Sequence, residues 1–153
     1  MARSIVLRIP ERDVGAVADL LDDEAARTCE LVWDRLPVEG RLVHGMYSGP
    51  ELFIVLPGWP GVSAENQVQR ALPGDVGYWH NPAGLHASAP EDVAELVFAY
   101  DRGVSIKGSD GSDSWVNLFA RIRTHEAREF LAVCKRSRTD GPWTLRVERG
   151  SEG

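Results

Sequence analysis

The feature that most constrains this chain is a series of short segments that are rich in β-branched and aromatic residues. Clusters of glycine, proline, serine and aspartate separate these segments. Such side chains suit a pleated, half-buried backbone, and the intervening residues favour turns. The predicted central strands span residues 41–47, 52–56, 76–79, 93–100 and 116–122. The pattern predicts a mainly β protein.

Further strands are expected near the two ends of the chain. Residues 4–9 alternate between apolar and polar side chains, and so do residues 143–148, as in a strand with one buried face. Residues 14–21 are shorter and less regular, and they are interpreted as a second strand that pairs back on the first.

Two segments have apolar residues at helical spacing instead. The first follows Asp22 and Asp23, whose carboxylates suit a helix start, and Pro37 ends it. The second begins at Thr124, another residue that favours a helix start. Two helices among seven or eight strands indicate a closed barrel with its ends covered by helices, because closure removes edge strands. Strand propensity alone does not distinguish this barrel from a sandwich.

Composition narrows the class of protein. The chain has 153 residues, of which 43% are hydrophobic and 26% charged, as in an ordinary soluble domain. We therefore expect one domain over residues 1–149 and a flexible tail over 150–153. With 17 basic and 23 acidic residues the formal charge is −6, so a broad nucleic-acid-binding surface is not expected.

The cellular compartment of the protein is predicted from its cysteines and from the absence of long apolar stretches. Cys29 and Cys134 lie far apart and form no C-x-x-C motif, which favours a reducing compartment over a disulfide framework. No stretch has the length of a signal peptide's apolar region or of a membrane span. The sequence therefore predicts a cytoplasmic protein that does not bind membranes.

Several segments resemble parts of cyclophilins, in the same order along the chain. Residues 20–32 (LLDDEAARTCELV) and 40–45 (GRLVHG) resemble the first helix of that family and the strand after it. Residues 73–82 (PGDVGYWHNP) and 94–99 (AELVFA) are similar to its middle strands, and 116–122 (VNLFARI) to the strand before its last helix. The likeness is greatest to small bacterial cyclophilin-like proteins of unassigned function. It implies a cyclophilin-like closed barrel of about eight strands with two capping helices.

The resemblance fails at the positions that serve prolyl isomerisation. Cyclophilins have an arginine directly after a phenylalanine–histidine pair, and Gly45 stands at that position here. Two further groove residues of the family, a phenylalanine and a glutamine, correspond to Pro50 and Phe53. Glycine supplies no donor to a substrate amide, so prolyl isomerisation is an alternative function and not the expected one.

Strand alternation indicates which residues face the remodelled groove. In the segment 93–100, Glu95 and Val97 are expected on the groove side, and Leu96, Phe98 and Tyr100 on the other. A carboxylate between apolar residues of a strand is solvated, paired or functional. Glu95 is therefore either a solvated rim residue or a functional one.

A second group of groove residues follows from the resemblance. Trp79, His80 and Asn81 align with a strand end that lines the groove, and Glu51 shares a strand face with Phe53. A carboxylate beside a histidine has the components of a general acid–base pair, although His80 is also compatible with a loop histidine bonded to backbone. The predicted catalytic residues are Glu51, His80 and Glu95. The predicted ligand-binding residues are Gly45, Tyr47, Phe53, Trp79, Asn81 and Val97.

The favoured function is binding of a small molecule in this groove, with hydrolysis of a small amide or cyclic amide as the candidate reaction. The histidines show no metal-binding spacing, and no cofactor or metal is expected. His44 is predicted to be a core histidine with both nitrogens bonded. Besides prolyl isomerisation, the other alternative is a non-catalytic interaction module. It includes a homodimer that closes through Trp59 or the segment 57–75, one of two long connections; 101–114 is the other.

Overall fold

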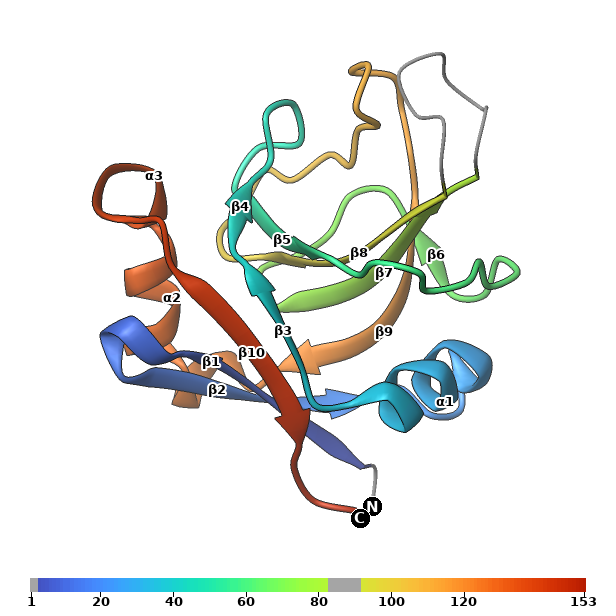
Figure 1. Cartoon of the computed structure of the whole chain (residues 1–153), viewed down its shortest axis with the longest axis horizontal. Helices are drawn as coiled ribbons and strands as arrows, with labels where there is room; N and C mark the ends of the chain where they lie inside the picture. The colour runs from blue at the N-terminus through green and yellow to red at the C-terminus, as the bar shows by residue number, and fades with distance from the viewer. Residues whose placement is uncertain (1–2, 83–91) are drawn as a thin grey trace.

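The protein is built on one antiparallel sheet of ten strands that curves into a nearly closed barrel (Figure 1). The structure, a computed structural model, describes residues 3–82 and 92–153. The strands are β1 (Ser4–Ile9), β2 (Val14–Leu20), β3 (Val38–Arg41), β4 (Val43–His44), β5 (Glu51–Val55), β6 (Gln67–Val68), β7 (Asp75–Asn81), β8 (Val93–Ala99), β9 (Val116–Ile122) and β10 (Thr144–Arg149). The helices are α1 (Ala26–Arg35), α2 (Arg128–Cys134) and α3 (Ser137–Asp140), with short 3₁₀ turns η1 (Pro10–Arg12) and η2 (Thr124–Glu126).

One chain segment closes the barrel. The strand order is β3-β10-β1-β2-β9-β7-β8-β5-β4, and β6 pairs with β9 outside this path. Since β3 and β4 are separated only by Leu42, the same segment pairs with β10 through its first half and with β5 through its second. The Leu42 amide donates to the Trp143 carbonyl at 2.9 Å where the segment changes partner. The two ends of the sheet are thereby joined.

The prediction of a mainly β protein with few helices is confirmed, whereas the count of about eight strands is too low. The expected strand over residues 41–47 is two short strands at 38–44, because the segment leaves β10 for β5 at Leu42. The long connection 57–75 also contributes β6, which adds a strand that its composition did not indicate. The second strand, at 14–20, is present and pairs with β1 along its length.

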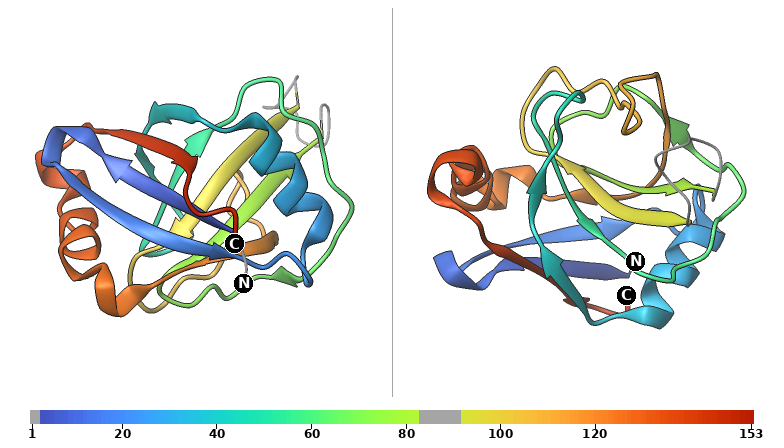
Figure 2. Two further views of the ribbon diagram at one scale, coloured as in Figure 1. Left: turned by 90° about the horizontal axis from the view of Figure 1, so that it is seen from below. Right: turned by 45° about the horizontal axis from the view of Figure 1, so that its top comes forward.

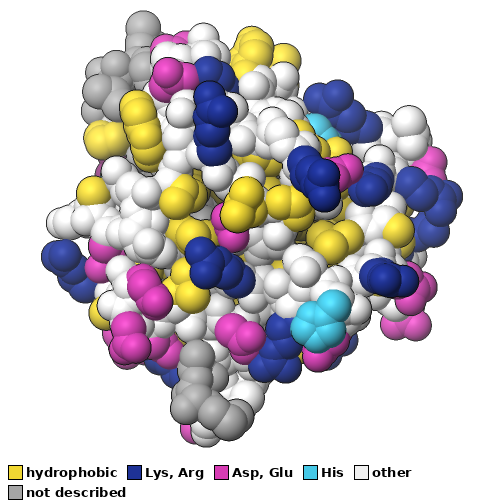
Figure 3. Space-filling view, turned by 180° about the vertical axis from the view of Figure 1, so that it is seen from behind, with side chains coloured by type: hydrophobic (Ala, Val, Ile, Leu, Met, Phe, Trp, Pro, Cys, Tyr) yellow, Lys and Arg dark blue, Asp and Glu magenta, His cyan; other side chains and the backbone are white. Residues whose placement is uncertain are grey.

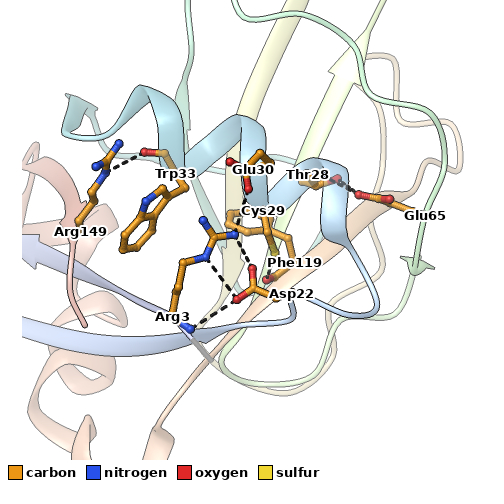
Figure 4. Close-up of polar contacts among 9 residues, drawn as sticks. All are labelled: Arg3, Asp22, Thr28, Cys29, Glu30, Trp33, Glu65, Phe119 and Arg149. Carbon is orange, nitrogen blue, oxygen red and sulfur yellow. Dashed lines mark hydrogen bonds and ion pairs between the residues drawn. The ribbon is translucent and has the colours of Figure 1, made fainter. Parts of the chain in front are cut away.

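The first helix begins later than the two aspartates indicate. Asp22 accepts hydrogen bonds from the Arg3 backbone amide at 3.4 Å and from the Arg3 guanidinium at 2.6 Å (Figure 4). Its carboxylate is thus used to tie the start of β1 to this turn, and α1 begins at Ala26 without a side-chain cap of its own. The second helical segment opens as the 3₁₀ turn η2, and α2 starts at Arg128. In Figures 1 and 2, α1 and α2 lie on opposite sides of the barrel.

Gly150 and Ser151, at the expected tail, are hydrogen bonded to Ser4. The Gly150 amide donates to the Ser4 carbonyl at 2.8 Å, and the Ser4 amide donates to the Ser151 carbonyl at 2.8 Å. The pairing between β1 and β10 therefore continues past the last residue of β10.

Alternation along the strands divides the buried residues into two clusters on opposite faces of the sheet. The main core fills the barrel and includes Leu52, Leu96 and Phe98 at no measurable exposure. Their neighbours in sequence point the other way, so that Val97 and Phe53 belong to a second, smaller cluster. The segment 101–114 covers that second face through Val104 and Ile106. The predicted parity of residues 93–100 agrees with this division.

Candidate functional site

A cavity of about 220 Å³ opens on the outer face of the barrel, where β4, β5, β7 and β8 meet the segment 101–114. Two hydrogen bonds tie this segment to Ser48: the Ser105 amide donates to the Ser48 carbonyl at 3.0 Å, and the Lys107 amide donates to the Ser48 hydroxyl at 2.9 Å. The cavity therefore lies between the sheet and this connection, which is above β5 and β8 in Figure 1.

Glu51 is the buried carboxyl group of this cavity. It begins β5, is 5% exposed, and lines the cavity from the strand edge. Burial raises its pKa to about 7, although the Ser48 hydroxyl acts in the opposite direction as a hydrogen-bond partner. Its Oε2 atom is buried and has no hydrogen-bond partner among residues 3–82 and 92–153. Glu51 therefore lines the cavity with a carboxyl group of which one oxygen is unsatisfied.

Gly45 leaves the space that this carboxyl group occupies. A β-carbon at position 45 would lie 2.5 Å from Glu51 Oε2, well inside the contact distance. The Gly45 amide also donates to the Glu51 carbonyl at 3.0 Å, which fixes the two residues side by side. Gly45 thus makes room for the carboxyl group of Glu51.

Glu95 contributes the second carboxyl group from the middle of β8. It lies opposite Trp79 in the ladder between β7 and β8 and is partly buried. Burial raises its pKa to about 8, and the charge of Glu51 adds to the shift. Two acids thus face one small cavity with pKa values close to neutrality, the range in which a carboxyl group can both donate and accept a proton.

His44 completes the cavity wall beside Gly45, half-buried, so the prediction of a core histidine is wrong, although both of its ring nitrogens are bonded as expected. Its Nδ1 lies 2.8 Å from the Gly45 carbonyl, which can only accept, so Nδ1 carries the proton. Its Nε2 then accepts from the Tyr100 hydroxyl at 2.8 Å. Burial lowers the pKa of His44, and the Arg138 guanidinium lowers it further. His44 is therefore a neutral, fixed part of the wall.

Aromatic rings form the apolar part of the cavity. Trp79 is held by its indole nitrogen, which donates to the Ser114 hydroxyl at 2.8 Å, and Phe53 packs beside the same cluster. Tyr47 stands at the rim, 54% exposed, next to Gly111 of the covering segment. Trp59, in contrast, is buried in the main core against Tyr78 and does not reach this rim.

His80 is not brought to the cavity with the two glutamates. It follows Trp79 in β7, and successive residues of a strand point to opposite faces. Its ring packs against Gly61, and its Nε2 lies 3.7 Å from the Asp92 carboxylate. The cavity therefore contains two carboxyl groups, from Glu51 and Glu95, and not the expected carboxylate and imidazole.

The other predicted residues take different positions. Gly45, Tyr47, Phe53 and Trp79 line the cavity. Val97 is buried in the apolar cluster on the same face of the sheet and is not exposed in the cavity wall. Asn81, at the end of β7, is also buried away from the cavity.

Sequence reasoning missed several lining residues, including Ser48, Lys107 and Ser109. The sequence indicated Lys107 and Ser109 only through the unusual length of the connection 101–114. The contact of this connection with Ser48 is seen only in the folded chain. His86, a histidine for which the sequence predicts a loop position and no function, lies outside the described residues.

Other reactive groups of the described part of the chain are buried or dispersed. Burial raises the pKa of Cys29 and of Cys134 to about 12, so neither is a thiolate near neutral pH.

Across residues 3–82 and 92–153, no three His, Cys, Asp or Glu side chains are grouped as metal ligands would be. No helix in these ranges is both long and apolar enough to cross a membrane. On the face in Figure 3, basic and acidic side chains are interspersed.

The fold and the cavity together define a class of protein: a mainly β barrel with a small, acidic, aromatic-walled pocket on its outer face. The chain belongs to the family described as "Protein of unknown function (DUF3830)", whose model matches residues 7–148. No protein of curated function matches it.

Two solved structures share the fold. The structure of McbB in complex with tryptophan has a TM-score of 0.68 at 18% identity, with 97% of this chain and 45% of McbB covered. The chain therefore spans less than half the length of McbB. The hypothetical protein AF2241 from Archaeoglobus fulgidus has a TM-score of 0.57 at 18% identity, with 97% of this chain and 95% of AF2241 covered. These matches support the barrel, and they do not identify it as cyclophilin-like.

Proposed function

We propose that this protein binds a small organic molecule in the cavity between β5, β8 and the segment 101–114, and that Glu51 and Glu95 transfer protons there. The observation that carries the proposal is the presence of two carboxyl groups, one of them only 5% exposed, on the wall of a single pocket. A cavity of about 220 Å³ is smaller than the pockets that hold drug-sized ligands, which favours a compact molecule.

Hydrolysis of a small amide or cyclic amide is the candidate reaction. One glutamate, ionised, would take a proton from the attacking water while the other, protonated, would give one to the leaving nitrogen. The carbon–nitrogen bond breaks and a carbon–oxygen bond forms, so water is the only co-reactant. Raised pKa values on both residues support this division of roles, because they keep both protonation states populated near neutral pH.

Two wider expectations also belong to the proposal. We propose that the barrel is cyclophilin-like, which the ordered series of similar segments supports. The complex of McbB with tryptophan gives a precedent for a protein containing such a barrel that binds an aromatic amino acid.

Prolyl isomerisation is less well supported, because Glu51 occupies the space beside Gly45. A homodimer through Trp59 is also less well supported, because that ring is buried within the chain.

The test is a thermal-shift screen of a library of small amides, amines, acids and alcohols. The wild type is compared with Glu51→Gln and Glu95→Gln, and the control is Glu24→Gln, an exposed glutamate away from the cavity. Compounds that raise the melting temperature of the wild type and the control, but not of the two cavity variants, would support the proposal. Absence of any stabilising compound, or an equal response in all four proteins, would overturn it.

A further inference from the structure

The cavity holds carboxyl oxygens that its own chain does not neutralise. Glu51 is almost fully buried, and its Oε2 occupies the space beside Gly45 without a hydrogen-bond partner in the described chain. A buried carboxyl group in this condition carries a large desolvation cost, which a bound cation or donor removes. The position therefore calls for a ligand with a hydrogen-bond donor, and a charged one would be the strongest.

The charged groups around the two acids do not supply that donor. Lys107 lines the cavity, but its ammonium group is bonded to Asp113 on the covering segment. Arg138, behind the wall, donates to the Gly45 carbonyl at 3.2 Å. The remaining titratable groups on the wall are His44, which is bonded and neutral as described above, and Tyr47 at the rim.

The apolar walls add a second requirement. Trp79 and Phe53 present flat aromatic surface beside the acids, and Tyr47 lies at the opening. Aromatic faces attract cations and stack against other rings. An anionic ligand would face two carboxyl groups and no unpaired cation on the described wall, which disfavours it.

From this arrangement we propose that the ligand is a small alkylamine that carries an aromatic ring, bound as its ammonium ion by Glu51 and Glu95 with its ring against Trp79 and Phe53. This inference rests on the proposed function, because it names the ligand class of the same cavity. It also assigns the two glutamates a binding role that does not depend on the reaction.

Proton linkage gives the inference a specific signature. The pKa values of about 7 for Glu51 and about 8 for Glu95 mean that both are largely protonated at pH 6. An ammonium ion binds the ionised form, so its binding displaces a proton from the pair. With one proton displaced, the affinity should rise about tenfold per pH unit below pH 7 and should level off above about pH 7.

The experiment uses three probes that share a ring and a short chain but differ in charge: phenethylamine, 2-phenylethanol and 3-phenylpropionate. Binding of each to the wild type is measured by isothermal titration calorimetry from pH 5.5 to 8.5. At pH 6.5, buffers of different ionisation enthalpy report the protons released. We expect phenethylamine to bind best at pH 8, with release of close to one proton at pH 6.5.

Two variants assign the effect to the acids. Glu95→Gln and Glu51→Gln should each weaken phenethylamine binding at pH 8 by about tenfold or more, since each replaces an ionisable carboxyl group by a neutral amide and so removes a negative charge from the cavity. The exposed-site control Glu24→Gln should bind as the wild type does. Circular dichroism establishes that each variant is folded before it is titrated.

Failure of the inference is distinguishable from failure of the proposed function. If the alcohol or the acid binds more tightly than the amine, or if amine affinity does not change with pH, the ammonium assignment is wrong. If 2-phenylethanol then binds to the wild type and Phe53→Ala abolishes that binding, the proposed small-molecule site still holds. If phenethylamine does not bind at millimolar concentration, the amine class is excluded, and the library screen alone decides the proposed function.

Discussion

Gly45 is the residue on which the cavity most depends, because its missing side chain is the space that Glu51 fills. The Glu51 carboxyl group is the end of a flexible side chain, so an added methyl group would displace it without dismantling the strand. An overpacked position of this kind costs about 1–3 kcal/mol.

The first prediction concerns Gly45→Ala. The variant should fold, and the pKa of Glu51 should fall from about 7 toward 4.5, because the carboxyl group moves out of its buried position. Carbon-13 NMR titration of the glutamate side chains measures this directly. The control is Gly61→Ala, whose β-carbon would meet the His80 ring at 2.9 Å, away from the cavity. An unchanged Glu51 titration in Gly45→Ala would contradict the prediction.

The second prediction concerns the energetic cost of the buried acid. Since the pKa of Glu51 rises from 4.5 in the unfolded chain to about 7 in the fold, the native state binds more protons between these values. Stability contributed by this group is thus present at low pH and is lost as pH rises through 7. The shift corresponds to up to about 3 kcal/mol.

Glu51→Gln removes this dependence, so its free energy of unfolding relative to the wild type should rise by up to about 3 kcal/mol between pH 4 and pH 8. Urea unfolding at both pH values measures the difference, and Glu24→Gln serves as the exposed-site control. A difference that is constant with pH would show that Glu51 titrates normally in the folded protein.

At the scale of elements, α1 is fixed by contacts from outside the helix. Glu65, in the long connection before β6, accepts from the Thr28 amide at 2.6 Å and from the Thr28 hydroxyl at 2.8 Å (Figure 4). Thr28 lies in the first turn of α1, where amide groups have no partner within the helix. A carboxylate from a distant segment therefore acts as the missing cap and faces the positive end of the helix dipole.

The third prediction follows from this contact. Glu65→Ala should lower the free energy of unfolding by about 1–3 kcal/mol, because two hydrogen bonds to a carboxylate are lost. Chemical denaturation gives the value, and Glu24→Ala, an exposed residue just before the same helix, should change it by less than about 0.5 kcal/mol. Equal effects of the two substitutions would mean that the Thr28 contact does not stabilise α1.

For the whole molecule, the least stable part of the barrel is the short strand β4, which closes it. β4 has only two residues and, among residues 3–82 and 92–153, pairs with β5 alone, whereas β7 pairs along most of its length with β8 on one side and with β9 on the other. Opening at β4 therefore breaks few hydrogen bonds, although it exposes the cavity wall at His44 and Gly45.

The fourth prediction is that amide hydrogens of residues 43–48 exchange through local opening, much faster than those of β7, β8 and β9, which exchange through global unfolding. Hydrogen exchange followed by NMR or mass spectrometry tests this, with β1 and β2 as a well-paired internal reference. Protection of 43–48 as strong as that of β8 would show that the barrel opens only when the whole domain unfolds.

The sequence by itself determined most of the strands, the two main helical regions and the face of β8 on which Glu95 lies. These follow from local preferences and from alternation, which any strand imposes on its own residues. It also singled out Glu51, Gly45, Phe53 and Trp79, because strand parity and an ordered resemblance place them on one side of the sheet.

The tertiary structure decided which of these residues meet. It separated His80 from the glutamates, since His80 directly follows Trp79 in β7 and successive residues of a strand point to opposite faces of the sheet. It joined Ser48 to the segment 101–114, and it let residues 38–44 close the barrel between β10 and β5. These are contacts between residues far apart in the chain, and their geometry depends on the register of every strand between them.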